Sequence, residues 1–443
     1  MNYAEAVQYL ESHVDLAGSR GDRFAVTLPD AGHTDGLSLD PVKALLEALG
    51  NPHEAYRTIH ITGTNGKGST ARFVSALLKA TDLSVATYTS PNIESINERL
   101  MWDGELISDE DFAEVMTLLA AVEPLVGHTP NRFELLTAAA FVWFAQMGVD
   151  VAVVEVGMLG RFDATNVVSG DVAVVTNIGK DHTSGGEGWQ VAVATEKAGI
   201  IKPNSHVVLG FSPEELAPVF AAEPSVATWT LGEDFVVESN QLAVGGRVVD
   251  VKTPNGFYEQ VFIPFHGAHQ GDNLAVALAA TEAFFGRAID MELVDQALSD
   301  VTLMGRFEVV ARHPLIILDG AHNPDGARAA SATLTEEFAR LGSWVLVIGL
   351  VGNKDPVEML EAFDATDFDA VICCEPDWNR RVPAQRIAAA AASLGIPAEV
   401  VTDPVEAVQR ALAVTAEEDL ILVSGTIYVL GDVRRALALA FQE

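Results

Sequence analysis

Residues 59–70 read Ile-His-Ile-Thr-Gly-Thr-Asn-Gly-Lys-Gly-Ser-Thr, and they carry the strongest local signal in the chain. Its apolar start predicts a strand, and its glycines predict a turn into a helix that begins near Lys67. Gly63, Gly66 and Gly68 let backbone N–H groups come close to phosphates, and a helix N-terminus adds a partial positive charge. Only two residues separate the first two glycines, and a glycine follows the lysine. The stretch therefore predicts a variant phosphate-binding loop.

The polar side chains of this loop suit a nucleotide. Lys67 supplies a full positive charge for the β- and γ-phosphates, and Ser69 or Thr70 can orient a phosphate or a metal. A plain glycine turn between a strand and a helix would need neither the lysine nor the hydroxyl groups. The loop indicates nucleotide binding but does not choose a reaction.

Apolar runs alternate with helical patterns along the rest of the chain, which predicts α/β layers with right-handed crossovers. Continuous apolar runs typical of buried parallel strands occur at 58–62, 151–156, 172–176, 206–209, 315–318, 344–349, 370–374 and 420–424. Segment 228–265 alternates and contains glycines, which favours antiparallel strands. We expect residues 1–302 to form one large α/β domain with a mostly parallel sheet and a small antiparallel segment. Residues 303–443 are expected to form a smaller α/β domain.

The charge of the chain excludes several partner classes. Its 443 residues include 27 Lys and Arg against 62 Asp and Glu, a net charge of −35. Such a field repels nucleic acid and anionic membranes and favours solubility, including in a salty cytoplasm. The only cysteines, Cys373 and Cys374, are adjacent and build no disulfide framework. The first residues lack a signal-peptide pattern, and no apolar run reaches the roughly 20 residues of a membrane span. We predict a cytoplasmic protein without nucleic-acid or membrane partners.

Three polar residues interrupt or follow segments that should be buried. Glu155 lies in an apolar strand, and a lone buried carboxylate costs several kcal/mol, so it is either a metal ligand or an ion-pair partner. His182 follows another strand, at the same sheet edge as the loop, where it suits a metal. Lys197 lies in a mostly apolar helix. Burial would lower its pKa and make the neutral amine accessible, whereas a surface lysine is the plainer alternative.

The second half of the chain repeats this pattern of strand ends with polar residues. Met-Gly-Arg-Phe-Glu starts at residue 304, and Leu-Asp-Gly-Ala-His-Asn-Pro starts at residue 318. Together they predict that the smaller domain offers Arg306, Asp319 and His322 to a ligand shared across a cleft.

The order of these motifs resembles that of the Mur ligase family and, within it, the folylpolyglutamate synthases, including those that are also dihydrofolate synthases. The resemblance runs from about residue 34 to residue 435 and includes GTNGKGS at 63–69, VEVG at 154–157, EKAGIIKP at 196–203, GRFE at 305–308, DGAHNP at 319–324 and SGTIYVLGDVR at 424–434. It implies a P-loop domain followed by a Rossmann-like domain. The implied reaction is an ATP-dependent amide ligation through an acyl phosphate.

The resemblance also implies roles for individual residues. For ATP these are Thr64, Asn65, Gly66, Lys67, Gly68, Ser69, Asn273, Arg306 and Asp319. For magnesium, with two ions expected, they are Ser90, Glu155 and His182. Lys197 matches a lysine that can be carbamylated and could then hold the second ion; a monovalent cation is also implied. The residues with catalytic roles are Lys67, Lys197 and His322. The pterin or folate residues are Thr34, Asp35, Gly36, Leu37, Asn131, Arg132, Phe133, Glu134 and Phe162.

The implied function is the addition of L-glutamate to reduced folates, and also to 7,8-dihydropteroate to give dihydrofolate. The partners are then ATP, L-glutamate and these acceptors, and the protein is expected to be a monomer. Three alternatives stay open at this point: polyglutamylation alone, a Mur ligase that acts on cell-wall precursors, and a regulatory nucleotide-binding protein without ligase activity. The last alternative leaves Glu155, His182 and the cluster in the second domain without an explanation.

Overall fold

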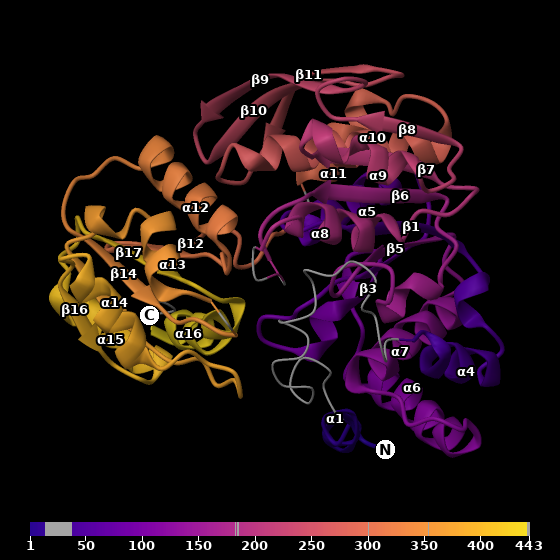
Figure 1. The fold of residues 1–443 in the computed structure, drawn as a ribbon, viewed down its shortest axis with the longest axis horizontal. Helices are drawn as coiled ribbons and strands as arrows, with labels where there is room; N and C mark the ends of the chain where they lie inside the picture. Colours follow the sequence, from indigo (N-terminus) through magenta and orange to yellow (C-terminus); the bar gives the residue numbers. More distant parts are fainter. Residues whose placement is uncertain (14–37, 182, 184–185, 300, 353, 441–443) are drawn as a thin grey trace. The chain divides into compact units, whose positions relative to one another are not determined.

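The computed structural model describes residues 1–13, 38–181, 183, 186–299, 301–352 and 354–440 (Figure 1). The chain forms two compact units. The first contains Met1–Asn240, Val248–Phe262 and Gly271–Val301, and the second contains Gln241–Arg247, Ile263–Gln270 and Thr302–Glu443. The main division thus lies after Val301. Two short segments before this point, Gln241–Arg247 and Ile263–Gln270, also belong to the second unit. A single boundary between residues 302 and 303 assigns them to the first domain instead.

An eight-stranded sheet, in the order β4-β3-β2-β5-β1-β6-β7-β8, forms the centre of the first unit. Its strands are β1 Arg57–Thr62, β2 Val85–Tyr88, β3 Leu100–Trp102, β4 Glu105–Leu106, β5 Val151–Glu155, β6 Val172–Asn177, β7 His206–Phe211 and β8 Ala227–Thr230. In this spatial order, the neighbouring strands β2, β5, β1, β6, β7 and β8 all pair in parallel. At the other edge, β3 pairs antiparallel with β2, and β4 pairs antiparallel with β3. This confirms the mostly parallel sheet. β1 lies in its middle, so the loop that follows β1 is flanked by the ends of β5 and β6.

Helices cover both faces of this sheet. They are α1 Tyr3–Glu11, α4 Asp40–Ala48, α5 Lys67–Lys79, α6 Asp109–Val122, α7 Arg132–Met147, α8 Trp189–Ala198, α9 Ala217–Ala221, α10 His269–Phe285 and α11 Met291–Ser299, with short 3₁₀ turns η1 Pro52–Glu54, η2 Ile96–Arg99, η3 Glu123–Leu125, η4 Ala164–Val167 and η5 Glu214–Leu216. α7 is apolar nearly all round and is buried against α4 and α6 (Figure 1). α5 packs on β1, β2 and β5. No helix among the described residues has the length and apolar character needed to cross a membrane.

The expected antiparallel segment begins later than predicted. Residues 227–230 form β8, which pairs parallel with β7, for example Val207 opposite Thr228, so the prediction of antiparallel strands from residue 228 is wrong at its start. β8 is an edge strand with partly exposed faces, and such a strand has the same alternating pattern as an antiparallel one. A separate three-stranded sheet follows, formed by β9 Val236–Ala243, β10 Gly246–Lys252 and β11 Phe257–Ile263. The two-residue connection between β9 and β10 is typical of an antiparallel hairpin.

The second unit contains a six-stranded sheet in the order β12-β13-β17-β14-β15-β16. Its strands are β12 Glu308–Arg312, β13 Leu315–Leu318, β14 Trp344–Ile348, β15 Ala370–Cys373, β16 Ala398–Val400 and β17 Leu420–Ser424, and its helices are α12 Pro324–Glu337, α13 Pro356–Ala362, α14 Ala384–Ser393, α15 Pro404–Val414 and α16 Ile427–Ala440, with η6 Ala365–Asp367. Only β12 is antiparallel. The carboxyl ends of the parallel strands share one edge, where α/β sheets bind ligands.

The acidic composition predicts that the folded state is more stable at high salt. The excess is 62 acidic against 27 basic side chains, and screening shortens the range of their repulsion from about 30 Å at 0.01 M salt to about 3 Å at 1 M. Exposed pairs such as Arg340–Asp369, whose side chains are 45% and 48% exposed, offset little of this repulsion. We expect Tm to rise by about 5 °C or more between these concentrations of KCl, as measured by calorimetry. Equal Tm values in both solutions would contradict the prediction.

Candidate functional site

The glycine-rich loop follows the carboxyl end of β1 and leads directly into α5. Gly66 is the N-cap of α5 and has a φ of 81°, in the left-handed region. A Cβ atom at Gly66 would lie 2.3 Å from Oδ1 of Asn273, and one at Gly63 would lie 1.8 Å from Oγ1 of Thr176. Both positions therefore require glycine, because a side chain would collide with neighbours that hold the loop.

The end of β6 holds this loop in place. The backbone N–H of Asn65 donates to Oδ1 of Asn177 (2.9 Å), whose Nδ2 donates back to the carbonyl of Asn65 (3.0 Å). Oγ1 of Thr176 donates to the same carbonyl (2.6 Å), and the N–H of Thr64 donates to the carbonyl of Asn177 (3.1 Å). The backbone that would face the phosphates is thus fixed in the protein itself.

Two lysines from distant parts of the chain converge on the loop. Nζ of Lys67 donates to the carbonyls of Gly63 (3.0 Å) and Thr64 (3.2 Å), and Nζ of Lys197 on α8 donates to Gly63 (2.7 Å). Lys197 is only 4% exposed, so the alternative of a surface lysine is wrong. Burial and the charge of Lys67 hold the pKa of Lys197 well below its ordinary value, although Asp181 and Asp163 act in the opposite direction. The neutral amine of Lys197 is thereby favoured.

Glu155 lies at the end of β5, on the face that α5 covers. Val154 belongs to the apolar cluster around α7, and successive side chains of a strand point to opposite faces, so Glu155 points toward α5. It is 3% exposed, and its Oε2 accepts the N–H of Ser90 (2.9 Å). Gly68 lies beside it, and a Cβ there would be 3.6 Å from Oε2. The start of α5 favours this carboxylate.

The residues around Glu155 fit a magnesium ion. They offer hard oxygen donors, and Oγ1 of Thr70 is a buried hydroxyl oxygen without a hydrogen-bond partner in the described part of the chain. Of the expected ligands, the structure brings Ser90 and Glu155 together, and His182 lies outside the described residues. No group of three or more His, Cys, Asp or Glu within the described ranges could hold a metal. Mg²⁺ is commonly bound by one or two carboxylates, substrate phosphates and waters, which agrees with this sparse set.

Sequence reasoning missed two acids near Lys197. Asp163 and Asp181 are 8% and 7% exposed, and both lie close enough to Lys197 to influence its pKa. Asp163 also holds the loop after β5, because its Oδ2 accepts the N–H of Met158 (2.9 Å) and its Oδ1 accepts the N–H of Thr165 (3.0 Å). The available signal was their place in the sequence, because Asp163 follows the VEVG motif at 154–157 and Asp181 directly precedes His182.

Several of the expected folate residues have a structural role at the start of α7. Oδ1 of Asn131 accepts the N–H groups of Phe133 (2.9 Å) and Glu134 (3.0 Å), and Oε2 of Glu134 accepts the N–H of Asn131 (2.7 Å), which is a capping box. Phe133 packs on Gly157, where a Cβ would lie 2.5 Å from its Cζ. Arg132 and Phe162 are partly exposed. Contact of this group with folate stays a prediction, and Thr34, Asp35, Gly36 and Leu37 lie outside the described residues.

Replacing Asn131 by alanine separates its capping role from substrate binding. Loss of the cap should lower the free energy of unfolding by about 1 kcal/mol, and contact with folate would also raise the KM for the folate acceptor about threefold or more. Ser108→Ala is the matched control, because Oγ of Ser108 caps α6 by accepting the N–H of Asp111 (3.0 Å). The measurements are urea unfolding and acceptor KM for both variants. If the acceptor KM of Asn131→Ala equalled that of the wild type, Asn131 would cap the helix without contacting folate.

The second unit brings Arg306, Asp319 and His322 together at the end of β13. Oδ2 of Asp319 accepts the N–H of Phe307 (3.0 Å). Gly320 lies against the guanidinium of Arg306, since a Cβ there would be 2.9 Å from Nη1. Nδ1 of His322 lies 2.9 Å from the carbonyl of Gly320. In the neutral ring Nδ1 must then carry the proton, which makes Nε2 the basic nitrogen.

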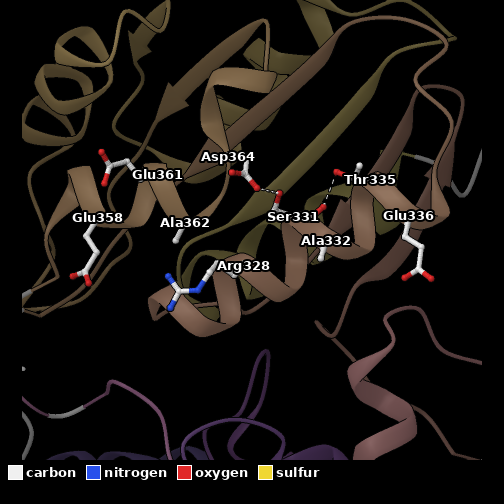
Figure 2. Close-up of a pocket in the computed structure, with 9 residues that line it drawn as sticks. All are labelled: Arg328, Ser331, Ala332, Thr335, Glu336, Glu358, Glu361, Ala362 and Asp364. Carbon is white, nitrogen blue, oxygen red and sulfur yellow. Dashed lines mark hydrogen bonds between the residues drawn. The ribbon is translucent and has the colours of Figure 1, made fainter. Parts of the chain in front are cut away.

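A pocket of about 600 Å³ lies elsewhere on this unit, between α12 and α13 (Figure 2). Figure 2 shows acidic side chains, including Glu358 and Glu361, among the residues that line it, and Ser331 donates to Asp364 on its wall (2.6 Å). Among the described residues, none of those expected to bind ATP, metal or folate lines this pocket.

Comparison with known proteins identifies the family. The model of the Mur ligase middle domain matches residues 61–281, and that of the Mur ligase glutamate ligase domain matches residues 305–427. A dihydrofolate synthase/folylpolyglutamate synthase of Mycobacterium tuberculosis is 38% identical over 381 residues, which cover 80% of this chain and 77% of that protein. This chain belongs to the Mur ligase family. The resemblance that the motifs indicate is confirmed.

Solved structures agree with this assignment. The folylpolyglutamate synthase of Mycobacterium tuberculosis in complex with ADP matches this Mur ligase with a TM-score of 0.89 and 32% identity, over 98% of both chains. A bifunctional folylpolyglutamate synthase/dihydrofolate synthase with Mn, AMPPNP and L-glutamate bound matches with a TM-score of 0.83 and 26% identity, over 99% of this chain and 98% of that one. The fold class, with its P-loop domain and Rossmann-like domain, is thereby confirmed.

Proposed function

We propose that this Mur ligase uses ATP to join L-glutamate to reduced folates and to 7,8-dihydropteroate. The observation that carries the proposal is the convergence of Lys67 and Lys197 on the carbonyl of Gly63, with the buried Glu155 beside the start of the same helix. Lys67 would supply positive charge to bound phosphates, and Glu155 would hold a magnesium ion that neutralises them further. The names of the similar proteins support folate and glutamate as the substrates.

The proposed reaction joins two anions, so its main requirement is neutralisation of charge. A folate carboxylate attacks the γ-phosphorus of ATP, the bond to the bridging oxygen of ADP breaks, and an acyl phosphate forms. The amine of glutamate then attacks the acyl carbon, and phosphate leaves. Lys67 and Arg306 stabilise the charge on the transferring phosphoryl group. A magnesium ion held by Ser90, Glu155 and His182 would act there as a Lewis acid.

Glutamate needs a base because its ammonium group is not a nucleophile. We assign this role to His322, whose Nδ1 is fixed by the carbonyl of Gly320 (2.9 Å). In this proposal Nε2 takes one proton from the ammonium group, which leaves the neutral amine as the nucleophile. The acyl phosphate reacts with water, so the ligase reaction also requires water to be excluded from the site.

The structure supports carbamylation of Lys197. Its neutral amine, favoured by burial, can attack the carbon of CO₂, forming an N–C bond and releasing one proton. With ¹³C-bicarbonate we expect a carbamate resonance in ¹³C NMR that is lost in Lys197→Met. Lys202→Met is the matched control, because Lys202 is a partly buried lysine of the same segment whose Nζ donates to Asn166 (2.8 Å). An unchanged resonance in Lys197→Met would rule out this site.

Release of ADP tests the function directly. The purified protein is assayed with Mg²⁺, ATP and L-glutamate, with dihydropteroate and tetrahydrofolate as separate acceptors and reactions without glutamate as controls. Turnover with both acceptors indicates the bifunctional enzyme, and turnover with tetrahydrofolate alone indicates polyglutamylation only. Turnover with a UDP-linked acceptor instead would indicate a cell-wall ligase. Binding of ATP without turnover of any acceptor would favour the regulatory protein.

A monomeric state, a cytoplasmic location, the absence of nucleic-acid partners and the monovalent cation stay predictions.

A further inference from the structure

A buried carboxylate of the second unit, Glu337, joins two segments that lie far from it in the sequence. It ends α12, and its side chain is 1% exposed. Oε1 accepts a hydrogen bond from Nη1 of Arg247 (2.7 Å) and one from the N–H of Gly267 (2.8 Å). Oε2 lies 2.7 Å from Nδ1 of His266. Arg247 lies in β10, and His266 and Gly267 belong to the segment that leads into α10.

Glu337 carries a negative charge in this cluster. Burial alone would raise its pKa, but the bonds from His266, Gly267 and Arg247 outweigh burial and hold the pKa below its ordinary value. The carboxylate is therefore ionised. The side chain of Arg247 is 2% exposed, and it also binds the half-exposed Glu336, with Nη2 at 3.0 Å from Oε1. Replacing a buried, paired carboxylate of this kind is destabilising, because the buried positive charge of its partner is then no longer balanced.

The cluster continues to the residues expected to bind ATP. The ring of His266 packs on Phe338 and Phe307, with centroid distances of 4.9 and 6.3 Å. The N–H of Phe307 donates to Asp319 (3.0 Å), and Arg306 directly precedes Phe307. His269, three residues after His266, also lies near this pair, since Asp319 and Arg306 both influence its pKa, which burial lowers.

We propose that Glu337 is a positioning residue for the nucleotide: it holds His266 against Phe307 and thereby fixes Arg306 and Asp319. This inference rests on the proposed function and on the expectation from the sequence that Arg306 and Asp319 contact ATP. Glu337 binds Arg247, Gly267 and His266, and it acts on the nucleotide only through His266 and Phe307. The consequence is a selective effect on ATP rather than on the later attack by glutamate.

Glu337→Gln tests the proposal, because glutamine keeps the shape but removes the charge. We expect the KM for ATP to rise about tenfold and kcat to fall as well, because Arg306 also stabilises the transferring phosphoryl group, while the KM for glutamate stays unchanged. Glu336→Gln is the matched control: it is the neighbouring residue, shares Arg247 as a partner, and is 49% exposed. Its KM for ATP should stay within about twofold of the wild type. Urea unfolding shows whether each variant is folded.

His266→Phe keeps the test valid if Glu337→Gln does not fold. Phenylalanine preserves ring packing on Phe307 but removes the bond to Glu337, so we expect the KM for ATP to rise about fivefold. Equal ATP affinities in the wild type and in both variants, or a loss of unfolding free energy alone, would overturn the proposal. Calorimetric titration with a non-hydrolysable ATP analogue measures the same effect without turnover. A wild type that binds the analogue but ligates no acceptor would refute the proposed function and leave the positioning role testable.

Discussion

Lys67→Met is expected to lower kcat about 10³-fold or more while the protein stays folded. Methionine keeps much of the length of the lysine but cannot neutralise the phosphate charge that develops during transfer. Nζ of Lys67 lies within hydrogen-bond distance of the carbonyls of Gly63 (3.0 Å) and Thr64 (3.2 Å), so it is already positioned in the loop. The measurement is glutamate-dependent release of ADP at saturating ATP.

Lys79→Met is the control for this variant. Lys79 is in the last turn of the same helix, α5, is exposed, and donates to the carbonyl of Asp103 (2.6 Å). Its activity should equal that of the wild type. A tenfold loss of kcat corresponds to only about 1.4 kcal/mol of activation free energy. If Lys67→Met retained a tenth or more of the wild-type kcat, the assigned role of this lysine would therefore be wrong.

Glu155→Gln is expected to lower kcat about 10²-fold and to raise the Mg²⁺ concentration required for half-maximal activity. Glutamine can still accept the N–H of Ser90, which Glu155 binds at 2.9 Å, so the local structure should persist. The variant loses an anionic oxygen, the ligand type that Mg²⁺ prefers. Activity as a function of Mg²⁺, with removal of the metal by EDTA and its addition again, measures the effect.

Glu98→Gln controls for the loss of a buried carboxylate as such. Glu98 is 7% exposed and accepts the N–H groups of Ile93 (2.7 Å) and Ser95 (2.6 Å) in the loop that follows Ser90. This variant should be less stable to urea but should require the same Mg²⁺ concentration as the wild type. The same Mg²⁺ requirement in Glu155→Gln would contradict a metal-binding role for Glu155.

Much of the central sheet could be predicted because its strands are buried on both faces and are therefore almost continuously apolar. β5, for instance, is Val-Ala-Val-Val-Glu, and every residue in it is buried. The same reasoning failed for β8, because an edge strand of a parallel sheet has one partner and partly exposed faces. Its pattern cannot be told from that of an antiparallel strand without knowledge of the neighbour.

The change from strand to glycine turn to helix at the phosphate-binding loop can be predicted from a short stretch of chain: Gly66 adopts a φ of 81°, and α5 begins at Lys67. The hydrogen bonds that hold the loop come from Thr176 and Asn177 at the end of β6, which only the fold brings there. The spacing of three residues between Asn131 and Glu134 is likewise typical of a capping box, a local signal that is independent of any folate contact. Such features depend on local backbone conformation, which a short stretch of chain can fix.

Which side chains are buried, and what pairs with them, depends on the packed fold. Lys197 meets Gly63 across 134 residues of sequence, and its burial excludes the surface alternative that the sequence left open. Glu337 likewise meets Arg247 across 90 residues. Desolvation and pairing depend on contacts that only the packed fold creates. The chemistry of these two groups therefore became visible only in the structure.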